Sequence, residues 1–288
     1  MASGWSCHRS SGTPSLLARM EIWKALVVGL VQGLSEFLPI SSSGHIALTQ
    51  FLLGIREVGR APEEDIAFEV VLHLGTFLSV VIYFRRRLWE LFLGLFQRAR
   101  TGERRMILWL VVATVPATLA YLLFKDFFEG AYNNPVMVGV FLLATGAILL
   151  LPQVYRASER EFGLGSAIWM GVAQAFAILP GISRSGSTIT AGLMAGSPPA
   201  RVAEFSFLMF LPAIGGGTLL KAKQLLEIVR SESGLAYGVG FLAAFFSGLA
   251  AVYLVLSAIR RGKLQYFAYY CFAAGAAAIV WFSSAGSA

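Results

Sequence analysis

The 288-residue chain contains little of what soluble enzymes and secreted disulfide-rich proteins depend on. Its two cysteines, Cys7 and Cys271, are too few and too far apart to indicate a disulfide framework or a cysteine-based metal cluster. Charged residues account for only 14% of the chain, whereas soluble domains contain about 25%. The sequence also has no Walker loop, no dinucleotide-binding fingerprint and no zinc-type cysteine-histidine spacing. The chain is therefore neither a soluble nucleotide-dependent enzyme nor a disulfide scaffold.

Apolar residues, in contrast, make up 57% of the chain, and their runs continue to the C-terminus. This leaves no room for a separate soluble core, so we expect a single membrane domain over residues 20–288. Residues 1–19 lack the apolar core of a signal peptide and are predicted to form a disordered tail. The net charge of +7 lies mainly in loops beside apolar runs, which indicates control of membrane topology and no nucleic-acid partner.

The apolar runs predict an all-α integral membrane protein. A full span needs about 20 residues, and six segments are long enough: 66–84, 106–123, 135–151, 202–220, 236–257 and 264–283. Two more segments are interrupted. Residues 22–53 break at Pro39 into a helix over 22–38 and a half-length helix over 46–53, and residues 165–196 break at Pro180. Irregular backbone at membrane depth must be buried in protein or line a wet cavity, so we expect two re-entrant broken-helix hairpins.

The arginine-rich loop over residues 85–105 fixes the predicted orientation, because positive loops face the cytoplasm. Three spans separate the two broken segments, so the second enters the membrane from the opposite face. The prediction is an inverted-topology repeat with halves at residues 20–151 and 162–288. Many secondary transporters have this architecture, so only the chemistry of the breaks can indicate another function.

The two breaks repeat each other in sequence. A shift of 142 positions aligns QGLSEFLPISSSGH, residues 32–45, with the segment that contains QAFAILPGISRSG. Among the positions that differ, three carry the contrast in functional groups, since Glu36, Ser42 and His45 of the first copy align with Ile178, Arg184 and Ser187 of the second. One copy therefore offers a carboxylate and the other a guanidinium.

Gln32 and Glu36 are four residues apart, so their side chains lie on one face of a helix. A carboxylate within the membrane is costly, which favours a functional role. With the Gln32 carbonyl, Glu36 is able to supply oxygen ligands to a hard divalent cation, Mg²⁺ or Ca²⁺. The alternative is a structural ion pair between Glu36 and Arg184.

Ser41, Ser42 and Ser43 stand within a few residues of His45, which is a candidate base for a serine nucleophile. In the alternative, the serines satisfy the broken backbone and His45 caps the following half-helix.

The segment from Pro180 to Thr188 has the composition of an anion cradle, with glycines, hydroxyls and a central Arg184 whose planar fork suits phosphate. A helix beginning near Ser187 or Thr188 would direct its N-terminal N–H groups at the same anion. Otherwise this segment is a hydrogen-bonded bend and Arg184 points outward. Elsewhere, Glu69 and His73 share a helix face and are interpreted as a buried structural pair.

Both motifs, QGLSEFLPISSSGH and PGISRSGST, resemble those of the undecaprenyl-pyrophosphate phosphatases, the bacitracin-resistance family, and the likeness extends from about Met20 to the C-terminus. The resemblance implies catalytic roles for Glu36, Ser42, His45 and Arg184, and a metal shell of Glu36 and Gln32. Gln32 stands where many members of that family have glutamate. The resemblance also implies phosphate contacts by hydroxyl groups beside Arg184, those of Ser41, Ser43, Ser183, Ser185 and Thr188.

The implied activity is removal of the terminal phosphate from undecaprenyl pyrophosphate, a polyprenyl lipid of cell-wall synthesis. The implied location is the bacterial cytoplasmic (inner) membrane, with several passes and a site open to the outer, periplasmic face. Membrane lipids are the expected surroundings, and a homodimer is one assembly compatible with the sequence. The competing class is an inverted-repeat transporter or lipid-phosphate flippase that uses the same polar residues without cleaving a bond.

Overall fold

The structure, a computed structural model, describes residues 21–55, 63–97, 99–132, 134–154, 160–220 and 234–285. Within these ranges the chain forms eleven helices and no strand, which confirms the all-α prediction. The predicted tail over residues 1–19 and parts of the charged loops lie outside the described residues. The helices are α1 Ile22–Phe37, α2 Ser42–Leu52, α3 Glu63–Tyr83, α4 Arg85–Phe96, α5 Thr101–Tyr132, α6 Pro135–Val154, α7 Leu164–Phe176, α8 Arg184–Met194, α9 Pro199–Leu220, α11 Gly234–Arg260 and α12 Gln265–Ala285.

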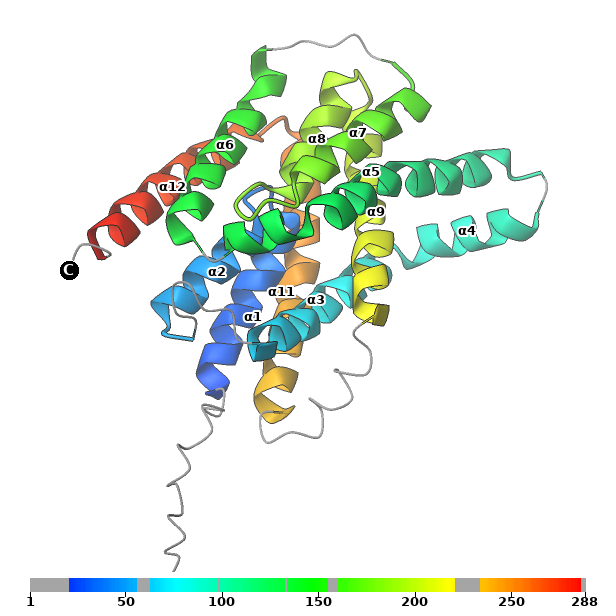
Figure 1. Ribbon diagram of the computed structural model, residues 1–288. Coiled ribbons are helices and arrows are strands. Elements are labelled where there is room, and N and C mark those ends of the chain that lie inside the picture. The colour runs from blue at the N-terminus through cyan, green and yellow to red at the C-terminus, as the bar shows by residue number, and fades with distance from the viewer. Residues whose placement is uncertain are drawn as a thin grey trace, which may run out of the picture.

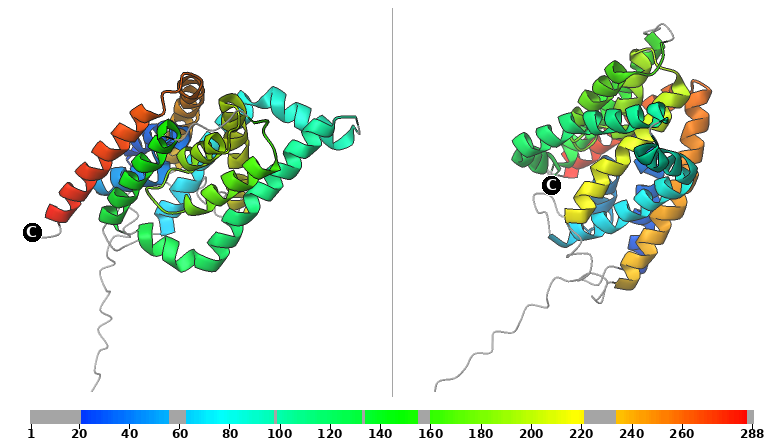
Figure 2. Two further views of the ribbon diagram at one scale, coloured as in Figure 1. Left: turned by 90° about the horizontal axis from the view of Figure 1, so that it is seen from above. Right: turned by 90° about the vertical axis from the view of Figure 1, so that its right-hand side faces the viewer.

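Long helices pack around the two short pairs that contain the sequence repeat (Figure 1). Helix α1 packs against α11, which also packs against α3, while α7 packs against α5. Helices α6 and α12 lie side by side along one flank, and α4 and α5 form a pair on the opposite flank (Figure 2). The short pairs α1–α2 and α7–α8 are held between these flanks.

Four described helices are long and apolar enough to cross a membrane: Thr101–Phe124, Pro135–Gln153, Gly234–Arg260 and Gln265–Ser284. A fifth candidate is the pair Phe68–Tyr83 and Arg85–Phe96, which is bent by 77°. Residues 202–220 are helical as predicted, within α9, but this helix is not among those candidates. The coarse prediction of a multi-pass membrane protein therefore agrees with the structure.

The arginine-rich segment differs from the predicted loop, because Arg85–Phe96 forms helix α4. Arg87 ties this helix to the bundle: its Nε lies 2.6 Å from Oε1 of Glu204 on α9, and its NH1 group donates to Glu90 at 2.9 Å. These ion pairs compensate part of the arginine charge and allow a basic stretch to fold as an amphipathic helix.

Both breaks end a helix and start the next one within a few residues. Helix α1 stops at Phe37 because Leu38, which precedes Pro39, is extended with φ −60° and ψ 138°. Helix α2 then starts at Ser42, not at residue 46 as predicted. Likewise α8 starts at Arg184, three residues before the expected Ser187. The reason is that Ser41 and Ser183 cap these helices, a function that the composition of a serine-rich run does not assign to one particular serine.

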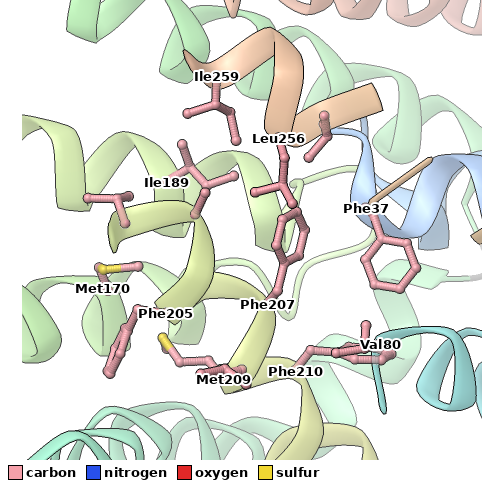
Figure 3. Packing of buried hydrophobic residues seen from close by; sticks show 14 of the residues in the cluster. Phe37, Val80, Met170, Ile189, Phe205, Phe207, Met209, Phe210, Leu256 and Ile259 are labelled. Atoms are coloured by element: carbon pink, nitrogen blue, oxygen red, sulfur yellow. The ribbon is translucent and has the colours of Figure 1, made fainter. Parts of the chain in front are cut away.

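An aromatic core packs against the end of α1, next to the first break (Figure 3). Phe37, fully buried at the end of α1, makes edge-on contacts with Phe207 and Phe210 of α9, with ring centroids 5.7 and 5.6 Å apart. Ile189 of α8 and Leu256 of α11 belong to the same cluster. Because Phe37 follows Glu36 directly, this packing fixes the backbone that carries the carboxylate.

Candidate active site

The two breaks lie against each other. Ser185 donates a hydrogen bond to the carbonyl oxygen of Leu38 over 3.2 Å. Gly44 and Gly181 approach so closely that a Cβ at Gly44 would be 3.1 Å from the Gly181 Cα, and Gly181 has a φ of 103°, which favours glycine. Segments 142 positions apart in the sequence therefore form one polar centre.

The serines at the start of α2 and α8 serve the backbone in the same way. Ser41 accepts a hydrogen bond from the N–H of Gly44 at 3.4 Å, and Ser183 accepts one from the N–H of Gly186 at 3.0 Å. Each capping hydroxyl also lies 3.3 Å from the hydroxyl two residues later, those of Ser43 and Ser185. These contacts support the backbone role that the sequence left open for the serines, and they show that both copies of the motif form the same cap contacts.

Glu36 is the centre of the site and is only 6% exposed. Its Oε2 accepts hydrogen bonds from the Ser42 hydroxyl at 2.7 Å and from the Gln32 amide at 3.0 Å. Its Oε1 accepts one from NH2 of Arg184 at 2.8 Å. A carboxylate with these partners is compensated in charge and aimed at one particular hydroxyl, that of Ser42.

Arg184 points into the protein. Its NH1 group donates to the carbonyl oxygen of Ser206 at 3.2 Å, and its guanidinium carbon lies 4.7 Å from the ring centroid of Phe210. Together with the Glu36 ion pair, these contacts fix the plane of the guanidinium. An arginine held in this way is suited to bind a planar set of anionic oxygens.

The hydroxyl of Thr188 is engaged within α8 and with α9. It donates to the carbonyl oxygens of Arg184 at 2.9 Å and Ser185 at 3.2 Å, and it lies 2.7 Å from the Ser206 hydroxyl. Among the hydroxyls predicted to act at the site, Ser42 is the one whose described hydrogen bond goes to a carboxylate. This contact distinguishes Ser42 from its neighbours.

His45 makes its hydrogen bonds away from Ser42. Its Nδ1 lies 2.8 Å from the carbonyl oxygen of Ser41, and its Nε2 lies 2.8 Å from the hydroxyl of Tyr270 on α12. The two rings stack with centroids 5.5 Å apart. Both ring nitrogens therefore have partners, and His45 connects the first break to α12.

His73 on α3 is the histidine that faces the carboxylate. Its Nε2 lies 3.7 Å from Oε2 of Glu36, and its Nδ1 lies 2.8 Å from the backbone carbonyl oxygen of Glu69. The sequence interpretation placed His73 in a structural pair with Glu69 and did not connect it with the site. The available signal was a histidine within an apolar helical run, which does not identify its partner on another helix.

The donors around Glu36 fit a divalent cation. Gln32 is fully buried, and its Oε1 has no hydrogen-bond partner among the residues that the structure describes, so an oxygen ligand is present beside the Glu36 carboxylate. Among the described residues, no cluster of three or more His, Cys, Asp or Glu side chains is arranged to hold a metal ion. The residues therefore suit a cation such as Mg²⁺, which retains water and substrate oxygens among its ligands.

The sequence of this chain is similar to those of known proteins over most of its length. The sequence model described as bacitracin resistance protein BacA matches residues 25–277, which include both breaks. An undecaprenyl-diphosphatase of Salinibacter ruber is 41% identical over 271 residues, covering 89% of this chain and 97% of its own. One of Syntrophotalea carbinolica is 42% identical over 262 residues, with the same two coverages. One of Bacteroides thetaiotaomicron is 38% identical over 262 residues, again covering 89% and 97%.

Proposed function

Because the chain belongs to the bacitracin resistance protein BacA family, we propose that it hydrolyses undecaprenyl diphosphate to undecaprenyl phosphate and inorganic phosphate. This activity returns the lipid carrier to cell-wall synthesis in the bacterial inner membrane. The observation that carries the proposal is the Ser42–Glu36–Arg184 chain of hydrogen bonds, which joins a hydroxyl, a carboxylate and a guanidinium across the two breaks.

Ser42 is the proposed nucleophile. Its Oγ attacks the terminal phosphorus while Glu36, 2.7 Å away, takes the hydroxyl proton. The Oγ–P bond forms, the bond from this phosphorus to the bridging oxygen breaks, and undecaprenyl phosphate leaves with the electron pair. Water then attacks the phosphoserine, the Oγ–P bond breaks, Ser42 regains a proton, and inorganic phosphate is released.

Arg184 stabilises the charge that shifts onto the phosphate oxygens during both steps. Its guanidinium is already oriented by Ser206 and Phe210, so little reorganisation is needed when a diphosphate competes with Glu36 for it. The Glu36 carboxylate then loses its ion pair with Arg184 and keeps its hydrogen bond with Ser42. Phosphate contacts remain a prediction for five hydroxyl groups, those of Ser41, Ser43, Ser183, Ser185 and Thr188. Several of them bond to the backbone and thereby hold the segments around Arg184 in shape.

A divalent cation, Mg²⁺ or Ca²⁺, is proposed to be held by Glu36 and Gln32. Bound there, it supplies positive charge to the diphosphate oxygens. The protein would supply two ligand groups to this cation, the Glu36 carboxylate and the side-chain oxygen of Gln32, which is unpaired among the described residues. His45 stays a prediction as base or nucleophile, and its contacts with Ser41 and Tyr270 favour a role in holding the break.

The finer architecture is proposed as six spans and two re-entrant hairpins in an inverted repeat, with the site open to the periplasmic face. Two close approaches support the repeat. A Cβ at Gly29 of α1 would lie 2.4 Å from the carbonyl oxygen of Gly240 on α11, and one at Gly171 of α7 would lie 2.6 Å from that of Ala113 on α5. Gly29 and Gly171 are again 142 positions apart. A homodimer is retained as a proposal for the assembly.

Phosphate release tests the function. The purified chain in detergent micelles, given undecaprenyl diphosphate and Mg²⁺, is expected to release inorganic phosphate, and a chelator is expected to reduce the rate by at least about 10²-fold through loss of charge stabilisation. Transport of the intact lipid across proteoliposomes without release of phosphate would contradict hydrolysis and support the transporter class. Full activity in the presence of chelator would remove the cation from the proposal.

A further inference from the structure

His73 has the geometry of a ligand for a cation shared with Glu36. Its Nε2 is 3.7 Å from Glu36 Oε2, which is longer than a hydrogen bond. It is also less than the maximum of about 4.2 Å between two donors that each lie about 2.1 Å from one ion. The two atoms are thus close enough to share an ion.

The other ring nitrogen of His73 fixes the tautomer. Nδ1 lies 2.8 Å from the backbone carbonyl oxygen of Glu69. A carbonyl oxygen only accepts hydrogen bonds, so the neutral imidazole carries its hydrogen on Nδ1 and has its lone pair on Nε2, the nitrogen on the side of Glu36. Metal-binding histidines almost always donate their second N–H to a carbonyl, a carboxylate or water. The Glu69 carbonyl therefore prepares His73 as a metal ligand.

Gln32 is an independent indication of a ligand at the same place. Its side chain is fully buried, and its amide nitrogen is 3.0 Å from the same Glu36 oxygen, Oε2. Its Oε1 has no hydrogen-bond partner within the described part of the chain. A buried acceptor without a partner is unfavourable, because it has lost its hydrogen bonds to water. A cation beside Glu36 would give this oxygen a partner.

His45 supplies the contrast. It has the same Nδ1 contact with a backbone carbonyl, that of Ser41, but its Nε2 is 2.8 Å from the Tyr270 hydroxyl. The hydroxyl donates to that nitrogen and occupies its lone pair. Of these two membrane-region histidines, His73 is the one with a nitrogen directed at the carboxylate.

We propose that His73 is a direct ligand of the divalent cation and that, with Glu36 and the Gln32 oxygen, it makes a mixed nitrogen–oxygen site that binds Mn²⁺ more tightly than Ca²⁺. This inference rests on the proposed cation at the site of hydrolysis. The physical reason is that Ca²⁺ takes oxygen ligands, whereas imidazole nitrogen favours first-row transition metals. With Gln32 at this position the site has a single carboxylate, that of Glu36, and His73 provides a further metal-binding side chain.

The test measures metal binding without substrate. Mn²⁺ and Ca²⁺ are titrated calorimetrically into the full chain in detergent micelles, and the pulsed EPR spectrum of bound Mn²⁺ is examined for coupling to ¹⁴N. The wild type is expected to bind Mn²⁺ at least about 10-fold more tightly than Ca²⁺ and to show nitrogen coupling. His73→Gln replaces the nitrogen donor by an oxygen donor, so the preference should fall to within about 2-fold and the coupling should disappear.

His45→Gln is the matched control and is expected to keep both the preference and the coupling. His73→Ala provides a second variant, and size-exclusion elution establishes that each variant is folded. A His73→Gln protein with unchanged preference and coupling, or an equal loss in His45→Gln, would overturn the proposal, as would a wild type that binds neither ion. Phosphate release is measured on the same samples, so that failure of the proposed hydrolysis and failure of the proposed His73 ligand can be told apart. A wild type that hydrolyses the lipid but shows no His73-dependent metal preference refutes only the assignment of His73 as a ligand.

Discussion

The first and second breaks have the same backbone chemistry and different side-chain chemistry. Ser41 and Ser183 cap their helices through equivalent contacts, yet Ser41 has a φ of 71° whereas Ser183 has a φ of −74°. A positive φ at a residue other than glycine is uncommon and marks strain of about 1–3 kcal/mol that the surroundings must maintain. The strained copy is the one that carries Ser42 and Glu36. The comparison shows a duplicated scaffold in which one copy carries Ser42 and Glu36, the proposed nucleophile and base, while the other carries the guanidinium of Arg184.

Two buried glutamines at matching positions of the repeat, Gln32 and Gln174, extend this comparison. Gln32 of α1 donates to Glu36. Its counterpart on α7, Gln174, has no hydrogen-bond partner for either side-chain polar atom among the described residues, and Ile178 stands where the first copy has Glu36. The same residue type therefore supports a buried carboxylate in one copy and has no such partner among the described residues in the other.

Removing the hydroxyl of Ser42 should have the largest effect. Ser42→Ala is expected to lower phosphate release by more than about 10³-fold, because loss of a nucleophile with its base removes a step that no neighbouring group replaces. Release of phosphate from undecaprenyl diphosphate is the measurement. The control is Ser35→Ala, whose hydroxyl bonds to the Val31 carbonyl within α1, and its rate should stay within about 2-fold of wild type. Equal rates in Ser42→Ala and wild type would transfer the attack to water or to His45.

Arg184→Ala should reduce turnover by about 10²- to 10³-fold, because it removes a preorganised donor for phosphate oxygens. It also leaves the buried Glu36 carboxylate without the guanidinium that neutralises it, which lowers the free energy of unfolding by about 3–5 kcal/mol. The double variant Glu36→Gln/Arg184→Ala should recover the stability and remain inactive. Kinetics together with thermal unfolding in detergent separate these effects, and a double variant with recovered activity would assign the pair a purely structural role.

The glutamine pair gives the smallest expected effect. Gln32→Met should lower the rate of hydrolysis by about 10-fold or more, because it removes a donor to Glu36 and an oxygen ligand. Gln174→Met should leave the rate within about 2-fold and raise the free energy of unfolding by about 1 kcal/mol, since it removes a buried amide without partners. Equal loss of activity in both variants would mean that the second glutamine belongs to the site as well.

The sequence allowed most of the elements to be predicted because their signals are local. Long apolar runs and Pro39 set the helices and the first break, and the offset of 142 positions identified the second. Arg85–Phe96 was predicted as a loop, because a dense run of arginines resembles a solvated turn until Glu204 of a distant helix is available to pair with Arg87. The starts of α2 and α8 were missed by a few residues, since several adjacent serines were equally suited to be the cap.

The candidate site could be predicted in part. Glu36 and Arg184 were selected by residue type within the repeated motif, and Ser42 was selected among the adjacent serines by the resemblance to the phosphatase family. The structure brings the three together. The partners of the histidines were not predictable in this way. His45 is next to the serines in sequence but bonds to Tyr270, while His73 is 37 positions from Glu36 and lies beside it.

By itself the sequence determined that this chain is helical, apolar and interrupted twice by the same polar motif, because hydrophobicity, proline and serine act on the backbone within a few residues. Which histidine faces the carboxylate, which serine caps and which serine bonds to Glu36 was decided only by the tertiary structure. The physical reason is that a buried charge takes its partners from whichever helices lie beside it. The packing of α3 against α1, and the position of Arg184 at the start of α8 next to Glu36, depend on contacts between segments far apart in the sequence.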